Sequence, residues 1–398
     1  MPAVNPDILI WARETAGMSP EDAAAKLGIG PARGALPEAR LAAYERGDDA
    51  PSRPLLVKMA KIYRRSLLTF YLPTPPRKGD RGEDFRSLPN QHTADEPLVD
   101  ALLRDVQARQ SMVRTLLEDE EEATPLPFVG SMTQQAGVDR VLASIQATLS
   151  LDLATFRAQG SIESGFSYLR DRAEAAGIFV LLIGNLGSHH TNLDVTAFRG
   201  FALADSLAPF VVINDQDAKS AWAFTLLHEI AHLWVGATGV SGSWGDSQLE
   251  RFCNTVASAF LLPQSELADL ALDPAADRDA IAHAIGAFAQ PRFLSRSMVA
   301  YRLFQAGRVS ERRWEDLSQY FRNEWRQQRE RQRDRSREQE GGPNYYVVRR
   351  HKLGTALLRF VDRNLSDGGL TPTKASKVLG VKPRSVAPLL SSLRQQVA

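Results

Sequence analysis

The chain has 398 residues, of which 24% are charged and 43% are hydrophobic, as is usual for a globular protein of two or three domains. Its 48 basic and 47 acidic residues leave a net charge of +1, so contact with nucleic acid or an anionic membrane requires a local charged patch. The single cysteine, Cys253, excludes an intramolecular disulfide framework and a cysteine-rich zinc module. A bound metal would therefore need histidine and carboxylate ligands.

The N-terminal residues carry no basic segment followed by an apolar core, so we expect no signal peptide there. No stretch of the sequence approaches the ~18 apolar residues of a membrane span. The lone cysteine is typical of a protein in a reducing compartment. We therefore expect a cytoplasmic protein with no membrane partner.

The first half of the chain is predicted to be helical. Apolar residues at helical spacing, with Ser19 as a helix N-cap, predict short helices over 6–72, which together form a small domain. Prolines and glycines in 73–94 predict a linker. Apolar residues then recur at a spacing of about 3.6 over 96–122, which predicts one long amphipathic helix.

A small sheet is predicted in the middle of the chain. After a helical stretch over 138–156, three short apolar runs predict strands, and a helical pattern follows them directly. The strand runs are 177–184, 198–205 and 209–215, and the helix covers 221–236. We therefore expect the α+β class, with a mainly helical multidomain chain and a small β-sheet packed on this helix.

The last third is again predicted to be helical. Residues 322–340 are almost all Arg, Gln and Glu, which predicts a solvated helix or a disordered tether. Residues 371–390 have the pattern of a helix, a short turn and a second helix. The expected domains are 1–72, 95–265 with a core of 177–263, a helical extension over 266–340, and a small helical domain over 341–398, with 73–94 as linker.

The pentapeptide HEIAH at His228 to His232 carries the strongest chemical signal. On a helix, residues i and i+4 share a face, so His228 and His232 can bind one Zn²⁺. Glu229 lies beside them without being a ligand, and it can act as the general base that takes a proton from the attacking water and passes it to the leaving amine. Two ordinary core histidines are the alternative interpretation.

A catalytic zinc usually has three protein ligands, so a third one is needed. The position six residues after His232 is Thr238, which excludes the spacing of three-histidine sites. Asp246 and Glu250 are the remaining candidates. Glu250 opens a second helical run that can pack against the first helix, and we favour it over Asp246. Alternatively, Glu250 only complements the dipole of that helix.

The stretch from Gly177 to Pro263 resembles the ImmA/IrrE family of bacterial and phage metallopeptidases, on the residues FTLLHEIAHLWV and a later helix ending in LLP. The strands before the motif, and the helical domain before Asp84 to Arg86, resemble the longer members with an N-terminal helix-turn-helix domain. The resemblance implies zinc ligands at His228, His232 and Glu250, with Glu229 as base. It also implies cleavage of DNA-bound repressors in stress or mobile-element responses.

The N-terminal domain departs from a repressor-type helix-turn-helix domain in one place. Gly30, Pro31, Gly34 and Pro37 fall where the recognition helix should begin, so we expect an interrupted groove-reading helix. Four arginines could still contact phosphates: Arg33, Arg40, Arg46 and Arg53. A scaffold or dimer domain that has lost DNA binding is the alternative.

Several other residues are weaker candidates. No oxyanion stabiliser can be assigned, and the candidates are Arg199 and the turn residues His189 and His190, which are more often simply solvated. Cys253 is expected to be a small packing residue rather than a nucleophile.

These observations predict a zinc-dependent endopeptidase that acts on a protein regulator. The expected cofactor is Zn²⁺, the expected partner is a protein substrate, and DNA and a second copy of the chain are further candidate partners. The alternative is a DNA-binding regulator with a structural or sensing zinc site and no peptidase activity. Retention of Glu229 favours the enzyme, because a structural site needs ligands but no base.

Overall fold

The structure is a computed structural model that describes residues 3–32, 34–76, 96–119, 123–187, 191–241, 248–273, 276–338 and 344–394. These residues fall into two compact units, one formed by 3–76 with 96–104 and the other by 105–394.

The first unit is a bundle of short helices, and it includes a helix that the sequence analysis did not expect. Its helices are α1 (Pro6–Thr15), α2 (Pro20–Leu27), α3 (Pro37–Arg46), α4 (Arg53–Ile62) and the 3-10 helix η1 (Leu67–Tyr71). The expectation of an interrupted recognition helix is wrong, because the breaking residues Gly30 and Gly34 lie in the loop between α2 and α3. Pro37 takes the first helical position of α3, where a missing N–H group costs nothing.

A buried ion pair joins α1 to α3 in this unit. The guanidinium of Arg13 donates to both carboxylate oxygens of Glu45, with Nε to Oε1 at 2.7 Å and Nη2 to Oε2 at 3.1 Å. Apolar side chains such as Ile8, Leu41 and Met59 fill the core around it. The position of α3 therefore depends on both apolar packing and one desolvated charge pair.

The second unit is built on a four-stranded mixed sheet. The strands are β1 (Phe179–Leu182), β2 (Gly200–Leu203), β3 (Phe210–Ile213) and β4 (Gly239–Ser241), in the order β1-β3-β2-β4. β1 pairs with β3 in parallel, and β2 pairs with β3 and β4 in antiparallel fashion. Every residue of β1, β2 and β3 is buried, because helices cover both faces of the sheet.

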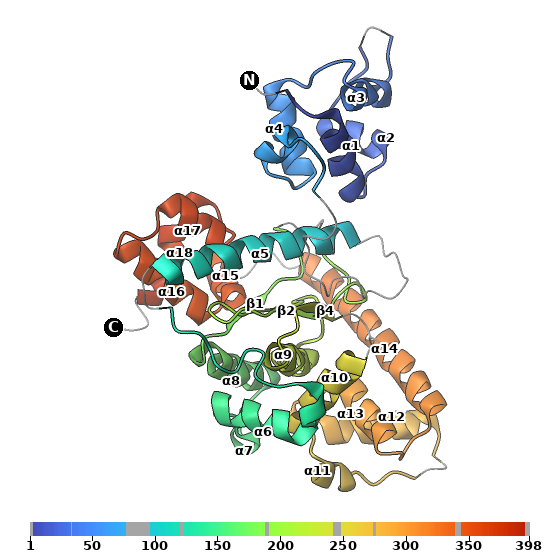
Figure 1. The fold of residues 1–398 in the computed structure, drawn as a ribbon. Coiled ribbons are helices and arrows are strands. Elements are labelled where there is room, and N and C mark those ends of the chain that lie inside the picture. Colours follow the sequence, from blue (N-terminus) through green and yellow to red (C-terminus); the bar gives the residue numbers. More distant parts are fainter. Residues whose placement is uncertain are drawn as a thin grey trace. The chain divides into compact units, whose positions relative to one another are not determined.

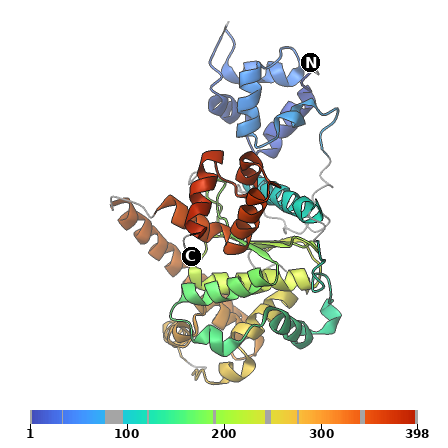
Figure 2. The same ribbon diagram turned by 90° about the vertical axis from the view of Figure 1, so that its left-hand side faces the viewer.

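Helices from distant parts of the sequence form the two covering layers (Figures 1 and 2). α8 (Ile162–Ala175) and α9 (Lys219–Trp234) pack on one face. The part of α5 (Glu96–Asp119) from residue 105 on lies on the other face, where Gln110 donates to the carbonyls of Leu203 and Ala208. α15 (Tyr345–Leu353) and α16 (Thr355–Ser366) lie on this face as well. The expected strands and the helix that follows them are thus confirmed, as is the α+β class.

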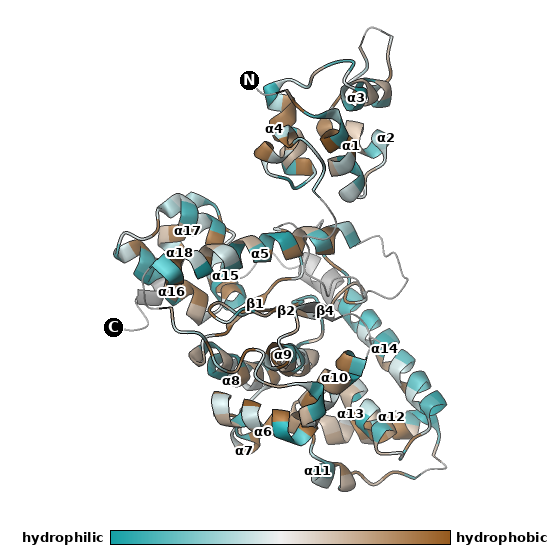
Figure 3. Ribbon diagram, viewed as in Figure 1, coloured by the Kyte–Doolittle hydropathy of each residue, from teal (hydrophilic) through white to brown (hydrophobic). Residues whose placement is uncertain are grey.

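Further helices surround α9 on the side away from the sheet. They are α6 (Val138–Leu149), α7 (Leu153–Arg157), α10 (Gln248–Leu261), α11 (Gln264–Ala268), α12 (Arg278–Ala289) and α13 (Arg296–Gln305), with the short 3-10 helices η4 (Gln134–Ala136) and η6 (Gln290–Arg292). The charged segment belongs to α14 (Glu311–Glu338), whose surface is hydrophilic along most of its length (Figure 3). The helix extends to residue 338, and residues 322–331 are exposed or half-buried, which supports the solvated helix over the disordered tether for this part.

The C-terminal helices are attached to the sheet through α15 and α16. They continue with α17 (Pro372–Val378), the 3-10 helix η7 (Pro383–Ser385) and α18 (Val386–Arg394). The carboxylate of Glu174 accepts the backbone N–H groups of Thr355 and Ala356, both at 2.9 Å, and so caps the start of α16. The ring of Phe360 packs edge-on against Phe179 of β1, with centroids 5.9 Å apart.

Candidate metal centre

The centre is built on α9, whose sequence is apolar nearly all round. A helix of this kind must be buried, and α9 is enclosed between the sheet and α10. His228 and His232 are one turn apart on the same face, and their ring centroids lie 4.8 Å apart. Their Nε2 atoms are 3.1 Å from each other, so both imidazoles point to the same place.

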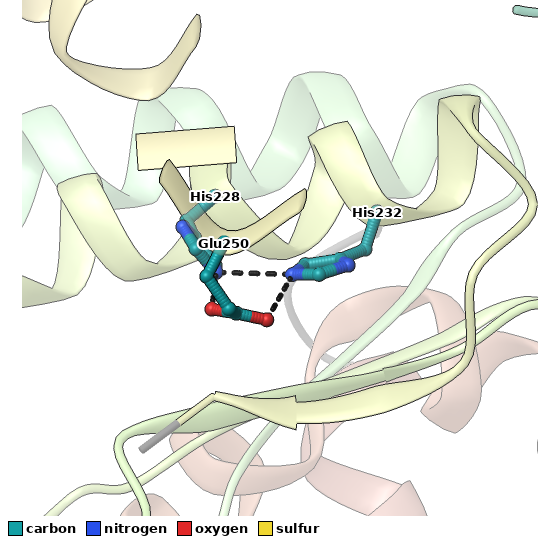
Figure 4. A group of neighbouring side chains, drawn as sticks. All are labelled: His228, His232 and Glu250. Carbon is teal, nitrogen blue, oxygen red and sulfur yellow. Dashed lines mark hydrogen bonds and ion pairs between the residues drawn. The ribbon is translucent and has the colours of Figure 1, made fainter. Parts of the chain in front are cut away.

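Helix α10 brings Glu250 to the two histidines (Figure 4). One carboxylate oxygen lies 3.2 Å from Nε2 of His228, and the other lies 3.2 Å from Nε2 of His232. The three potential ligand atoms all lie within 4.8 Å of one another. Among the described residues, this is the group of three His, Cys, Asp or Glu side chains that could hold a metal ion.

The electrostatics of the cluster suit a cation. Burial lowers the pKa of His228, and the neighbouring His232 lowers it further, so the neutral imidazole that a metal requires is favoured. Burial raises the pKa of Glu250, but the hydrogen bonds with His228 and His232 outweigh it and hold the pKa below its usual range. Glu250 is therefore ionised at neutral pH and offers a negative charge to a metal.

Glu229 points from α9 toward the sheet, where Gly200 makes room for it. The Glu229 side chain is fully buried. A Cβ atom placed on Gly200 would lie 2.7 Å from Oε1 of Glu229 and 2.7 Å from Cγ2 of Thr225. The sequence analysis missed Gly200, although a glycine inside a strand pattern often marks the close approach of another group.

Two of the weaker candidate residues of this region, Cys253 and Arg199, have partners or surroundings that the structure describes. Cys253 is fully buried, and burial together with the carboxylates of Glu250 and Glu229 raises its pKa, which agrees with a packing role. Arg199 lies 3.5 Å from a carboxylate oxygen of Asp217 in an ion pair. The other third-ligand candidate, Asp246, and the turn residues His189 and His190 lie outside the described residues.

Two of the candidate DNA contacts have partners within the first unit. Arg40 on α3 donates to the carbonyl of Gly30 at 2.6 Å, and Arg46 forms an exposed ion pair with Asp48 at 2.8 Å. Arg53 is exposed at the start of α4, while Arg33 lies outside the described residues. Their contact with phosphates remains a prediction.

Both parts of the chain match known families. The second unit carries a peptidase domain and the first carries a helix-turn-helix domain: residues 175–304 match the peptidase family model described as the IrrE N-terminal-like domain, and residues 9–70 match the helix-turn-helix model. The chain therefore combines a segment similar to the peptidase domain of the ImmA/IrrE family with a segment similar to helix-turn-helix domains, a combination that supports a metallopeptidase-type regulator.

The matched peptidase segment contains the whole cluster of His228, His232 and Glu250. No curated protein and no solved structure matches the chain. No helix within the described parts of the chain has both the length and the apolar character needed to cross a membrane.

Proposed function

We propose that the chain is a zinc-dependent endopeptidase of the gluzincin type, which cleaves a transcriptional repressor or another protein regulator. The observation that carries this proposal is the convergence of three donor atoms from two helices on one point, inside the segment that matches a peptidase family. In this proposal His228, His232 and Glu250 hold the metal, and Glu229 is the general base.

The donor set fits zinc. Two imidazole nitrogens and one carboxylate are the ligands of many catalytic zinc sites, which keep a fourth position open for water or substrate. Nδ1 of His232 has no hydrogen-bond partner among the described residues, whereas its Nε2 faces His228 and Glu250. Nε2 is therefore the nitrogen that would bind the metal. A zinc ion bound there would polarise the scissile carbonyl and make a nearby water molecule more acidic.

The chain's own contribution to the chemistry comes from Glu229. It is next to His228 in the sequence, and its carboxylate lies between α9 and β2, at the end of the strand where Gly200 pairs with Ser241 of β4. From this position it takes a proton from the attacking water and delivers it to the amine nitrogen as the peptide bond breaks. The burial of Glu229 keeps bulk water from competing for that proton.

The substrate class follows from the domain combination. A DNA-binding domain on the same chain would bring the peptidase to regulators that are bound to DNA, and stress-response or mobile-element repressors are the substrates that the family resemblance implies. The 18% exposure of the Glu250 side chain, against 4% and 2% for the two histidines, supports entry of a substrate from the α10 side.

Expression of the chain in cells, followed by a comparison of protein N-termini, tests this function. Cells with the wild-type chain should contain new N-termini in one or a few regulators, and cells with His228→Ala and His232→Ala together should lack them. Candidate substrates include regulators encoded beside the chain, supplied by co-expression. Identical sets of N-termini in the two strains would contradict the proposal.

A further inference from the structure

The end of the chain has a charge balance unlike the rest. Residues 368–398 contain five basic residues and no acidic residue, so this segment has a charge of +5. The preceding 367 residues contain 43 basic and 47 acidic residues and sum to −4. A protein that is nearly neutral overall therefore concentrates positive charge in its last three helical segments, which is the electrostatic pattern of a nucleic-acid contact.

The same segment has the backbone geometry of a helix-turn-helix motif. Helix α17 ends before a four-residue turn over 379–382, in which Gly380 has the left-handed φ of +60°. Lys382 is the N-cap of the 3-10 helix η7, which leads into α18. Two helices joined by a short turn with a glycine define the motif, and α16 packs against both as its third helix.

The interior of this three-helix unit is apolar and its basic residues lie outside. The buried side chains are Leu370, Ala375, Val378, Leu379, Val386 and Leu389. The exposed basic residues are Lys374, Lys377, Lys382 and Arg384. None of these four forms an ion pair with another described residue. Their charges are therefore directed to solvent and are not used to hold the fold together.

Attachment to the peptidase domain uses other elements of the unit. α15 and α16 make the contacts with β1 and α8, including the cap that Glu174 of α8 provides for α16. Lys352 of α15 also pairs with Asp215, which follows β3, at 2.5 Å. Arg349 of α15 contacts the turn directly, because its guanidinium donates to the carbonyl of Gly380 at 2.5 Å. Arg109 of α5 lies so close to Gly380 that a Cβ atom there would be 2.2 Å from its Nη2. Arg349 and Arg109 thus lie behind the turn, and Arg109 is itself paired with Asp105 at 2.5 Å.

We propose that the surface formed by Lys374, Lys377, Lys382 and Arg384 is a second DNA-binding site, which contacts the phosphates of duplex DNA around the start of α18. This site is separate from the helix-turn-helix domain at residues 9–70, and it does not depend on peptidase activity. Duplex DNA is favoured over duplex RNA, because a helix enters the wide major groove of DNA and cannot enter the deep, narrow major groove of RNA.

DNA binding by the full-length chain tests the proposal. Fluorescence anisotropy with a labelled DNA duplex of about two helical turns should be recorded over a range of salt concentrations. The variant Lys382→Ala with Arg384→Ala should bind on the order of tenfold more weakly than the wild type. Its salt dependence, the slope of log K against log salt, should fall by about 2, because two phosphate contacts are lost.

A matched control removes the same charge elsewhere. Arg312→Ala with Arg140→Ala deletes two exposed arginines of α14 and α6, outside the three-helix unit, so it should leave both affinity and slope near the wild-type values. All four substituted side chains are exposed, and equal thermal unfolding midpoints would show that the variants are folded. The proposal is overturned if the wild-type chain does not bind DNA, if the two double variants bind equally well, or if an RNA duplex of the same sequence binds more tightly than DNA.

Discussion

The buried ion pair between Arg13 and Glu45 gives a prediction about the helix-turn-helix domain. The two side chains are 10% and 9% exposed, and the pair joins α1 to the C-terminal half of α3. Glu45→Gln keeps the size of the side chain but removes its charge, so the buried guanidinium of Arg13 keeps only the exposed carboxylate of Glu14, 3.7 Å away, as a counter-charge. Removal of one partner from such a pair costs about 3–5 kcal/mol, because a desolvated charge is left uncompensated.

This loss of folding free energy is large for a small domain. Domains are stable by about 5–15 kcal/mol in total, so the loss removes a large part of that stability and raises the population of molecules with α3 open by about 10²–10³-fold. The control is Asp48→Asn, which breaks the ion pair between Asp48 and Arg46. The side chains of this pair are exposed, Arg46 by 61% and Asp48 by 58%. Exposed pairs contribute about 0.2–1 kcal/mol, so this neighbouring change should have little effect.

Hydrogen exchange of the α3 amides in the full-length chain measures the difference. Glu45→Gln should raise their exchange rates by roughly two orders of magnitude or more, and Asp48→Asn by less than about tenfold. The double variant Arg13→Met with Glu45→Leu should recover most of the protection, because an apolar pair can replace a buried ion pair. If Glu45→Gln and Asp48→Asn affect exchange equally, the buried pair does not hold α3 as we describe.

Three further predictions concern the metal centre. The purified chain should contain about one zinc ion, and His228→Ala should remove it, as elemental analysis would show; retention of the metal would disprove the ligand assignment. Gly200→Ala should leave the zinc content intact and reduce cleavage, because the added Cβ would displace the Glu229 carboxylate, whereas unchanged cleavage would show that this space is not needed. The thiol of Cys253 should react with a thiol reagent near pH 8 only after unfolding, because burial raises its pKa, and rapid labelling of the native chain would contradict this.

The strands and the helix of the metal centre could be predicted because their signals are local. The three apolar runs and the helical pattern after them contain enough information to locate β1, β2, β3 and α9. The spacing of His228 and His232 also places both rings on one helix face without knowledge of the fold. The approach of Glu250 depends on the packing of α10 against α9, so the sequence could only rank it above Asp246.

The expectation about the recognition helix failed for a physical reason. Gly30, Pro31 and Gly34 were weighed as helix breakers together with Pro37, although a proline at the first helical position favours a helix start. The structure places the first three in a loop and begins α3 at Pro37. A glycine inside a strand pattern indicates a close approach at Gly200, but only the fold shows that the approaching group is the Glu229 carboxylate.

Substitution of Glu229 tests the central claim most directly. Glu229→Gln keeps the size and polarity of the side chain and leaves His228, His232 and Glu250 in place. The account predicts that the variant binds zinc as the wild type does, while cleavage of the regulator substrate falls by about 10²–10⁴-fold, the loss expected for a general base. A Glu229→Gln chain that still cleaves its substrate at the wild-type rate would contradict the peptidase mechanism proposed here.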